Sequence, residues 1–309
     1  MGSGSWSPTD WDTYASTKAY ASTATTTKDI YKSRGMDASL DPKGVEFRES
    51  CDSVDNPLST PIIVGLDVTG SMHNVLDSMA RKGLNTLATA IYDRKPVTNP
   101  HIMAMGIGDV EAHDKAPLQV TQFEADIRIA DQLTKIWLEG CGGGNNHESY
   151  LLPWYFAAQH TKIDSFTKRN KKGYLFTIGD EQPQMILKAS DVEIVLGYAP
   201  QSDLTAEDLL AKVSQHYEVF HLMVAEGNHM RRYRDRVISE WSGLLGQRAL
   251  LLEDHTKLAE VIVSAIQVVE GESVDSIAAS WDGSTGLVVR TAITGLMSAP
   301  DSTSGVVRL

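Results

Sequence analysis

The segment Asp67-Val68-Thr69-Gly70-Ser71 combines one carboxylate with two hydroxyls at a spacing that could hold a divalent cation. It follows the apolar run Pro61–Leu66 and precedes a stretch with helical periodicity, so it is expected to form the turn between a buried strand and a helix. At such a turn the three oxygen-bearing side chains can face one point. Oxygen ligands of this kind suit Mg²⁺, with Mn²⁺ as a substitute. The alternative interpretation is that Thr69 and Ser71 only cap the helix while Asp67 only stabilises the turn.

The elements around this turn predict an α/β domain. Short apolar runs alternate with amphipathic helices from Pro61 onward, which is typical of a mainly parallel sheet with helices on both faces. We therefore expect a Rossmann-like doubly wound sheet of six strands. Residues 101–108 and 118–123 should form a hairpin, which makes one edge strand antiparallel. Strands are expected at residues 62–67, 101–108, 118–123, 173–177, 219–225 and 249–252. The main helices are expected at residues 72–92, 129–137, 148–160, 205–213, 233–245 and 258–269.

The chain divides by composition into three parts. Residues 1–60 are polar and rich in Ser and Thr, with scattered aromatic residues, and are interpreted as an N-terminal arm that orders by packing on another surface. Residues 61–271 form the α/β domain, and residues 272–309 form a partly helical C-terminal extension. Arms of this kind could support self-assembly.

Composition and charge exclude several classes of function. A formal net charge of -12 argues against binding to nucleic acid, which favours Lys and Arg. Apolar stretches are far shorter than the roughly 18–20 residues of a membrane span, and the first residues show no basic region followed by an apolar one, so we expect neither a membrane span nor a secretory signal. Two cysteines, Cys51 and Cys141, are too few for a disulfide scaffold. We expect a cytoplasmic protein, or one built into a virion or other assembly formed in the cytoplasm.

The segment from Asp67 to Met72 resembles the first part of the metal-ion-dependent adhesion site of von Willebrand factor A domains, and the likeness spans roughly residues 61–270. The resemblance implies a third ligand before a helix about seventy residues on and a second acid after the fourth strand. Those places here are residues 142–149 and 177–181. It further implies that Thr69 and Ser71 bind the metal directly, while Asp67 and Asp180 act largely through water.

Two departures from the family pattern affect the ligand set. Asn145 stands where the family has threonine, and its carbonyl oxygen makes it the candidate third ligand, with Asn146, Glu148 or Ser149 as alternatives. The usual Thr-Asp-Gly is replaced by residues 177–181, in which Asp180 is favoured over Glu181 because it lies nearer the strand end. The resembling fold places the first and fourth strands side by side, where the strand order reverses and ligands bind in open α/β sheets.

Three functions are compatible with these features. The leading hypothesis is a metal-dependent protein-binding module, not an enzyme, whose partner supplies an Asp or Glu carboxylate to the metal. A structural subunit of a phage particle or bacterial assembly is the alternative. A phosphohydrolase with Asp67 as nucleophile is less favoured, because Thr69 stands where that chemistry commonly has a second acid. By analogy alone, the resemblance also implies a MoxR-type AAA+ ATPase as partner.

Overall fold

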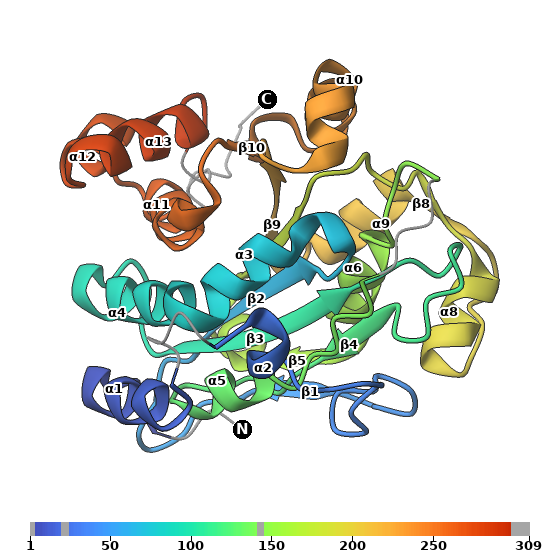
Figure 1. Cartoon of the computed structure of the whole chain (residues 1–309), viewed down its shortest axis with the longest axis horizontal. Helices are drawn as coiled ribbons and strands as arrows, with labels where there is room; N and C mark the ends of the chain where they lie inside the picture. The colour runs from blue at the N-terminus through green and yellow to red at the C-terminus, as the bar shows by residue number, and fades with distance from the viewer. Residues whose placement is uncertain (1–3, 20–24, 141–144, 298–309) are drawn as a thin grey trace, which may run out of the picture.

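A six-stranded sheet forms the centre of the molecule (Figure 1). The computed structural model describes residues 4–19, 25–140 and 145–297. The strand order is β10-β9-β6-β2-β3-β4, and every strand is parallel to its neighbours except β4 at one edge. The expected α/β fold with one antiparallel edge strand is confirmed. The strands are β2 (Thr60–Asp67), β3 (Pro100–Ile107), β4 (Leu118–Val120), β6 (Gly173–Gly179), β9 (Tyr217–Val224) and β10 (Ala249–Leu252).

Helices cover both faces of this sheet (Figure 1). One face packs against helices that follow β2, β4 and β10: α3 (His73–Ser78), α4 (Leu84–Arg94), α5 (Arg128–Leu133), α11 (Leu258–Val269), α12 (Val274–Ala279) and α13 (Gly283–Ile293). The other face packs against α6 (Leu151–Gln159), α8 (Ala189–Leu196), α9 (Ala206–Val213) and α10 (Asn228–Leu245). The remaining helices are α1 (Pro8–Thr17), α2 (Thr27–Ile30) and α7 (Asp164–Arg169).

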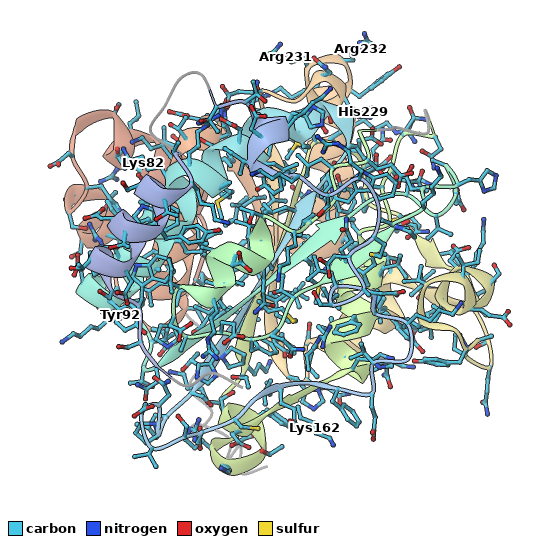
Figure 2. All side chains as sticks on the ribbon, turned by 60° about the horizontal axis from the view of Figure 1, so that its bottom comes forward. Lys82, Tyr92, Lys162, His229, Arg231 and Arg232 are labelled. Carbon is cyan, nitrogen blue, oxygen red and sulfur yellow. The ribbon has the colours of Figure 1, made fainter. Side chains whose placement is uncertain are left out.

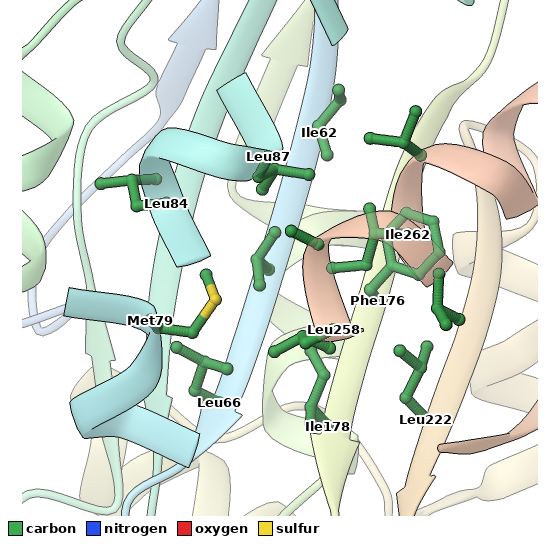
Figure 3. Close-up of a cluster of buried hydrophobic side chains, with 14 of the residues drawn as sticks. Ile62, Leu66, Met79, Leu84, Leu87, Phe176, Ile178, Leu222, Leu258 and Ile262 are labelled. Atoms are coloured by element: carbon green, nitrogen blue, oxygen red, sulfur yellow. The ribbon is translucent and has the colours of Figure 1, made fainter. Parts of the chain in front are cut away.

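Strand β2 separates two hydrophobic cores because successive side chains of a strand point to opposite faces. Ile62, Val64 and Leu66 join the core under α4 and α11, whereas Ile63 joins the core under α6. Figure 3 shows the first of these cores, in which Ile62 and Leu66 lie near the helices above the sheet. All eight residues of β2 are buried, so the turn that follows it is anchored to a rigid strand.

The helical stretch after β2 is not one regular helix. It begins with a 3₁₀ turn at Gly70–Met72, continues as α3, contains a π-helical turn at Met79–Gly83 and ends as α4. A side chain at Gly83 would collide with the sulfur of Met79, so glycine at this position suits the local packing. Such wide turns are compatible with the periodicity that predicts a helix, but periodicity alone does not reveal them.

The N-terminal segment lies on the domain. Trp6, Trp11, Ile30, Tyr31 and Leu40 are buried in the core on the α3 and α4 side of the sheet. The segment also supplies β1 (Arg48–Ser50), which pairs in parallel with β5 (Thr161–Ile163) in a separate small sheet. A third small sheet joins β7 (Ile186–Leu187) to β8 (Leu204–Thr205).

Within the described part of the chain, no helix is both long enough and apolar enough to cross a lipid bilayer.

Candidate functional site

The turn after β2 folds around the carboxylate of Asp67. Oδ1 of Asp67 accepts hydrogen bonds from the backbone N–H of Thr69 at 2.8 Å and from its hydroxyl at 2.6 Å. The hydroxyl of Tyr150 donates to Oδ2 at 3.2 Å. Asp67 is completely buried and Thr69 nearly so. Both carboxylate oxygens of Asp67 are therefore fixed by residues of the chain itself.

A second acid reaches this turn from β6. Strands β2 and β6 are neighbours in the sheet, as the resemblance implied, so their carboxyl ends lie side by side. The hydroxyl of Ser71 donates to Oδ1 of Asp180 at 2.8 Å, and the N–H of His229, in the first turn of α10, donates to Oδ2 at 2.9 Å. The structure therefore brings Asp67, Thr69, Ser71 and Asp180 together at one edge of the sheet.

Two glycines allow this close approach. A Cβ on Gly179 would overlap the Tyr150 hydroxyl that bonds to Asp67. A Cβ on Gly227, just before α10, would overlap the side chain of Asp180. The site therefore needs glycine at these two positions as well as the acids and hydroxyls.

The loop before α6, residues 145–150 and here called the third loop, contributes Asn145 and Glu148 in different ways. The amide nitrogen of Asn145 donates to Oδ2 of Asp109 at 2.6 Å, while its carbonyl oxygen is buried without a hydrogen-bond partner among the described residues. Glu148 is 1% exposed, and its Oε2 also lacks such a partner. Ser149 instead accepts a hydrogen bond from the N–H of Val110, and Asn146 is exposed. Gly142, Gly143 and Gly144, which precede this loop, lie outside the described residues.

The helix expected from residue 148 begins later, at Leu151. Glu148 and Ser149 instead belong to the turn before it, with both side chains buried near the sheet end. The physical reason is that the two polar side chains face inward at the edge of the sheet, where Ser149 bonds to the backbone of Val110. Helical periodicity places residues on a face but does not show that the first turn is replaced by an inward-facing loop.

Burial and mutual repulsion raise the pKa values of the acids at this edge. Burial is the largest cause of the raised pKa of Asp67, the neighbouring Asp180 raises it further, and the hydrogen bonds from Thr69 oppose the shift. The pKa of Glu148 is also raised, first by burial and then by the charges of Asp67 and Glu181. Burial, followed by the charges of Asp67 and Asp180, raises the pKa of Glu181 to about 8. Ionising these acids together is therefore unfavourable without a nearby cation, because the place is poorly screened by water.

No described residue supplies a balancing positive charge. Asp67, Glu148 and Asp180 form no ion pair with any residue in the described ranges. The ring of His229 lies 3.9 Å from Glu181, but burial lowers the pKa of this histidine and so favours its neutral form. Buried carboxylates without a counter-charge are costly, so a bound cation would stabilise this arrangement.

The hydroxyls of Thr69 and Ser71 fit a hard metal ion. Their oxygens lie 3.5 Å apart, and adjacent ligands of Mg²⁺ are separated by about 3 Å. Each hydroxyl directs its proton to an acid, Thr69 to Asp67 and Ser71 to Asp180, so neither has a proton left for the other. Their lone pairs are consequently available to a cation. The donor set of hydroxyl, carboxylate and amide oxygens therefore fits Mg²⁺ or Mn²⁺.

Sequence reasoning missed Asp109 and Tyr150. Asp109 follows β3, the strand next to β2, and is buried beside the third loop through its bond with Asn145. Its signal in the sequence was an acid immediately after a predicted strand. Tyr150 had no comparable signal, because its contact with Asp67 depends on how α6 packs under the sheet.

A separate group of ligand-type side chains lies after β9 and β10. Oxygen or nitrogen atoms of Glu226, Asp254 and His255 lie within 4.8 Å of one another. Glu226 already accepts hydrogen bonds from the backbone N–H of His255 and pairs with Nδ1 of the same residue. These side chains are exposed or half-buried, and Asp254 accepts hydrogen bonds from Thr256, so they differ from the buried acids beside Asp67.

The fold and this site together define an α/β protein with a Rossmann-like, mostly parallel sheet and a polar site at the carboxyl ends of its strands. Comparison of the sequence with protein-family models gives no match, and comparison with curated proteins gives none. Two solved structures of the pilus adhesin SpaC from Lactobacillus rhamnosus GG, one in an open conformation, align with 11% identity and a TM-score of 0.43. Each alignment covers 73% of this chain, but only 31% and 32% of the adhesin chains.

Proposed function

We propose that the chain is a metal-dependent protein-binding module that holds Mg²⁺, or Mn²⁺ in its place, at the edge of the sheet formed by β2 and β6. The observation that carries the proposal is the set of buried acids without a counter-charge among the described residues, beside two hydroxyls whose oxygens lie 3.5 Å apart and whose protons are donated to Asp67 and Asp180. When bound, the metal would supply a positive charge that attracts an oxygen ligand from outside the chain.

The residues of the chain would have different roles in binding the ion. Thr69 and Ser71 are the direct ligands, while Asp67 and Asp180 orient them and neutralise charge. Asn145 and Glu148 are the candidates for the third loop, because each has a buried oxygen without a partner among the described residues. Hydroxyls are neutral ligands, so the site keeps affinity for an Asp or Glu carboxylate of a partner.

Asp67 is poorly suited to attack a phosphoryl group. Both of its oxygens accept hydrogen bonds, and the side chain is completely buried. A nucleophile needs one oxygen free to reach its substrate. This arrangement supports a positioning role for Asp67 and a binding function for the site.

Affinity capture from the native cells tests this function. Wild type and Asp67→Asn are used as bait side by side, in Mg²⁺ and in chelator, with the exposed Asp12→Asn as the matched control. A partner retained by wild type and Asp12→Asn in Mg²⁺, and lost in chelator and with Asp67→Asn, supports the proposal. Partners that are indifferent to both changes would contradict it.

A further inference from the structure

The first turns of α10 carry two arginines whose side chains have no partner among the described residues. Arg231 and Arg232 are exposed, and among the arginines in the described ranges they are the two without a hydrogen bond or ion pair from their side chains. Neighbouring Arg234 and Arg236 are paired with Glu253 and Glu240. In a chain of net charge -12, an unpaired pair of arginines is a local exception.

These arginines lie close to the proposed metal site. Two residues before Arg231, the N–H of His229 donates to Asp180. A helix rises about 1.5 Å per residue, so Arg231 and Arg232 are about 3 to 5 Å further along the axis. Figure 2 shows both projecting outward at the tip of α10, with His229 nearer the body of the molecule. They therefore flank the edge of the sheet where a partner would approach Ser71 and Asp180.

An exposed aromatic ring completes this surface. Tyr233 is 46% exposed, and its ring packs against the ring of His229 at 4.7 Å between centroids. The backbone of Tyr233 departs from helical geometry, which sets the first turn of α10 apart from the rest of the helix. Asp235, further along α10, forms no ion pair with Arg231 or Arg232. Arginine and tyrosine are among the residue types enriched at the centres of protein interfaces.

We propose that Arg231, Arg232 and Tyr233 form a second contact for the same partner, and that this partner presents an acidic segment with at least two carboxylates. This inference rests on the proposed function, in which one carboxylate meets the metal. A second carboxylate on the segment would then pair with the arginines. Because an extended chain advances about 3.3 Å per residue, acids two to four residues apart could reach both places. Charge complementarity with Arg231 and Arg232, the local positive exception on an acidic molecule, selects an acidic protein segment as the occupant.

The test compares two labelled synthetic peptides in Mg²⁺ at low ionic strength, by fluorescence anisotropy. One contains a single Asp in a Gly/Ser background, and the other has a Glu three residues after that Asp. Wild type should bind the two-acid peptide about threefold to tenfold tighter than the one-acid peptide. The double variant Arg231→Gln/Arg232→Gln should bind both peptides equally. The matched control Lys82→Gln/Lys212→Gln removes the same charge from exposed positions elsewhere and should keep the preference.

A separate measurement distinguishes failure of this inference from failure of the metal site. Thermal melting with and without Mg²⁺ shows whether wild type and the arginine variant are folded and bind the ion. If Mg²⁺ stabilises both proteins but wild type shows no preference for the two-acid peptide, or the variant retains it, the arginine contact alone is overturned. If Mg²⁺ stabilises neither and neither peptide binds, both proposals are overturned. Tighter binding of a single-stranded DNA oligonucleotide, lost in the arginine variant, would overturn the choice of an acidic protein segment.

Discussion

The hydroxyl of Ser71 donates a 2.8 Å hydrogen bond to Oδ1 of Asp180, which joins the end of β2 to the end of β6. Ser71→Ala removes this bond and one proposed metal ligand. We expect a loss of about 1 kcal/mol in the free energy of unfolding without metal, and at least a tenfold loss in Mg²⁺ affinity. Urea unfolding and calorimetric titration measure the two effects. An unchanged Mg²⁺ affinity would remove Ser71 from the ligand set.

Gly227→Ala tests the close packing around Asp180. The new methyl group would overlap Asp180, so we expect a loss of about 1 to 3 kcal/mol in stability and a weaker response to Mg²⁺. Gly243→Ala is the matched control, because this exposed glycine within α10 has no atom within 4 Å of the added methyl. The free energy of unfolding of Gly243→Ala should rise by about 0.5 to 1 kcal/mol, because alanine favours a helix more than glycine does. Equal behaviour of the two variants in thermal melting would contradict the packing argument.

His221 should make stability depend on pH below about 6.5. It is completely buried, stacks on Trp241 at 3.6 Å and bonds through Nδ1 to Thr177, and burial lowers its pKa. Below pH 6.5 the unfolded chain binds a proton that the folded chain resists, so stability is lost as pH falls, by at most about 1.4 kcal/mol per pH unit. This contribution is fully present above pH 6.5.

The comparison is with His221→Gln, by urea unfolding in chelator between pH 7.5 and about 5. The variant is expected to be less stable overall because the stacked ring is lost, so the informative quantity is the slope with pH. Wild type should lose more stability on acidification than the variant. Parallel slopes would show that folding does not lower the pKa of His221, which would contradict this prediction.

Deleting residues 1–55 should leave the central sheet folded but less stable. None of the six strands lies in this segment, whereas Trp6, Trp11 and Tyr31 bury their side chains against the domain. Removing such side chains costs about 1.5 to 3 kcal/mol each in lost burial. Circular dichroism and thermal melting should show a cooperative transition at a lower temperature. The absence of a cooperative transition would make the segment part of the folding core.

Local patterns predicted the features that depend on neighbours in the sequence. The six strands and the turn from Asp67 to Ser71 follow from apolar runs and turn chemistry. The approach of Asp180 followed from the order of strands in the resembling fold. It needed the further assumption that β2 and β6 are neighbours, which the sheet confirms.

Features set by long-range packing were not predicted. The Tyr150 hydroxyl meets Asp67 across 83 positions of sequence, and Asn145 meets Asp109 across 36. The inward turn of Glu148 replaces the first turn of an expected helix. None of these contacts leaves a periodic or compositional signal, because each depends on how separate elements meet at the sheet edge.

The most direct test of the account is thermal melting of wild type, Asp67→Asn and Asp12→Asn, each with and without Mg²⁺. Asn at position 67 keeps an oxygen acceptor for Thr69 but removes the charge, while Asp12 is exposed on α1. At a Mg²⁺ concentration about a hundredfold above Kd, wild type and Asp12→Asn should gain about 2.7 kcal/mol of stability, and Asp67→Asn should gain almost none. Equal stabilisation of all three proteins, or of none, would contradict a metal site at Asp67.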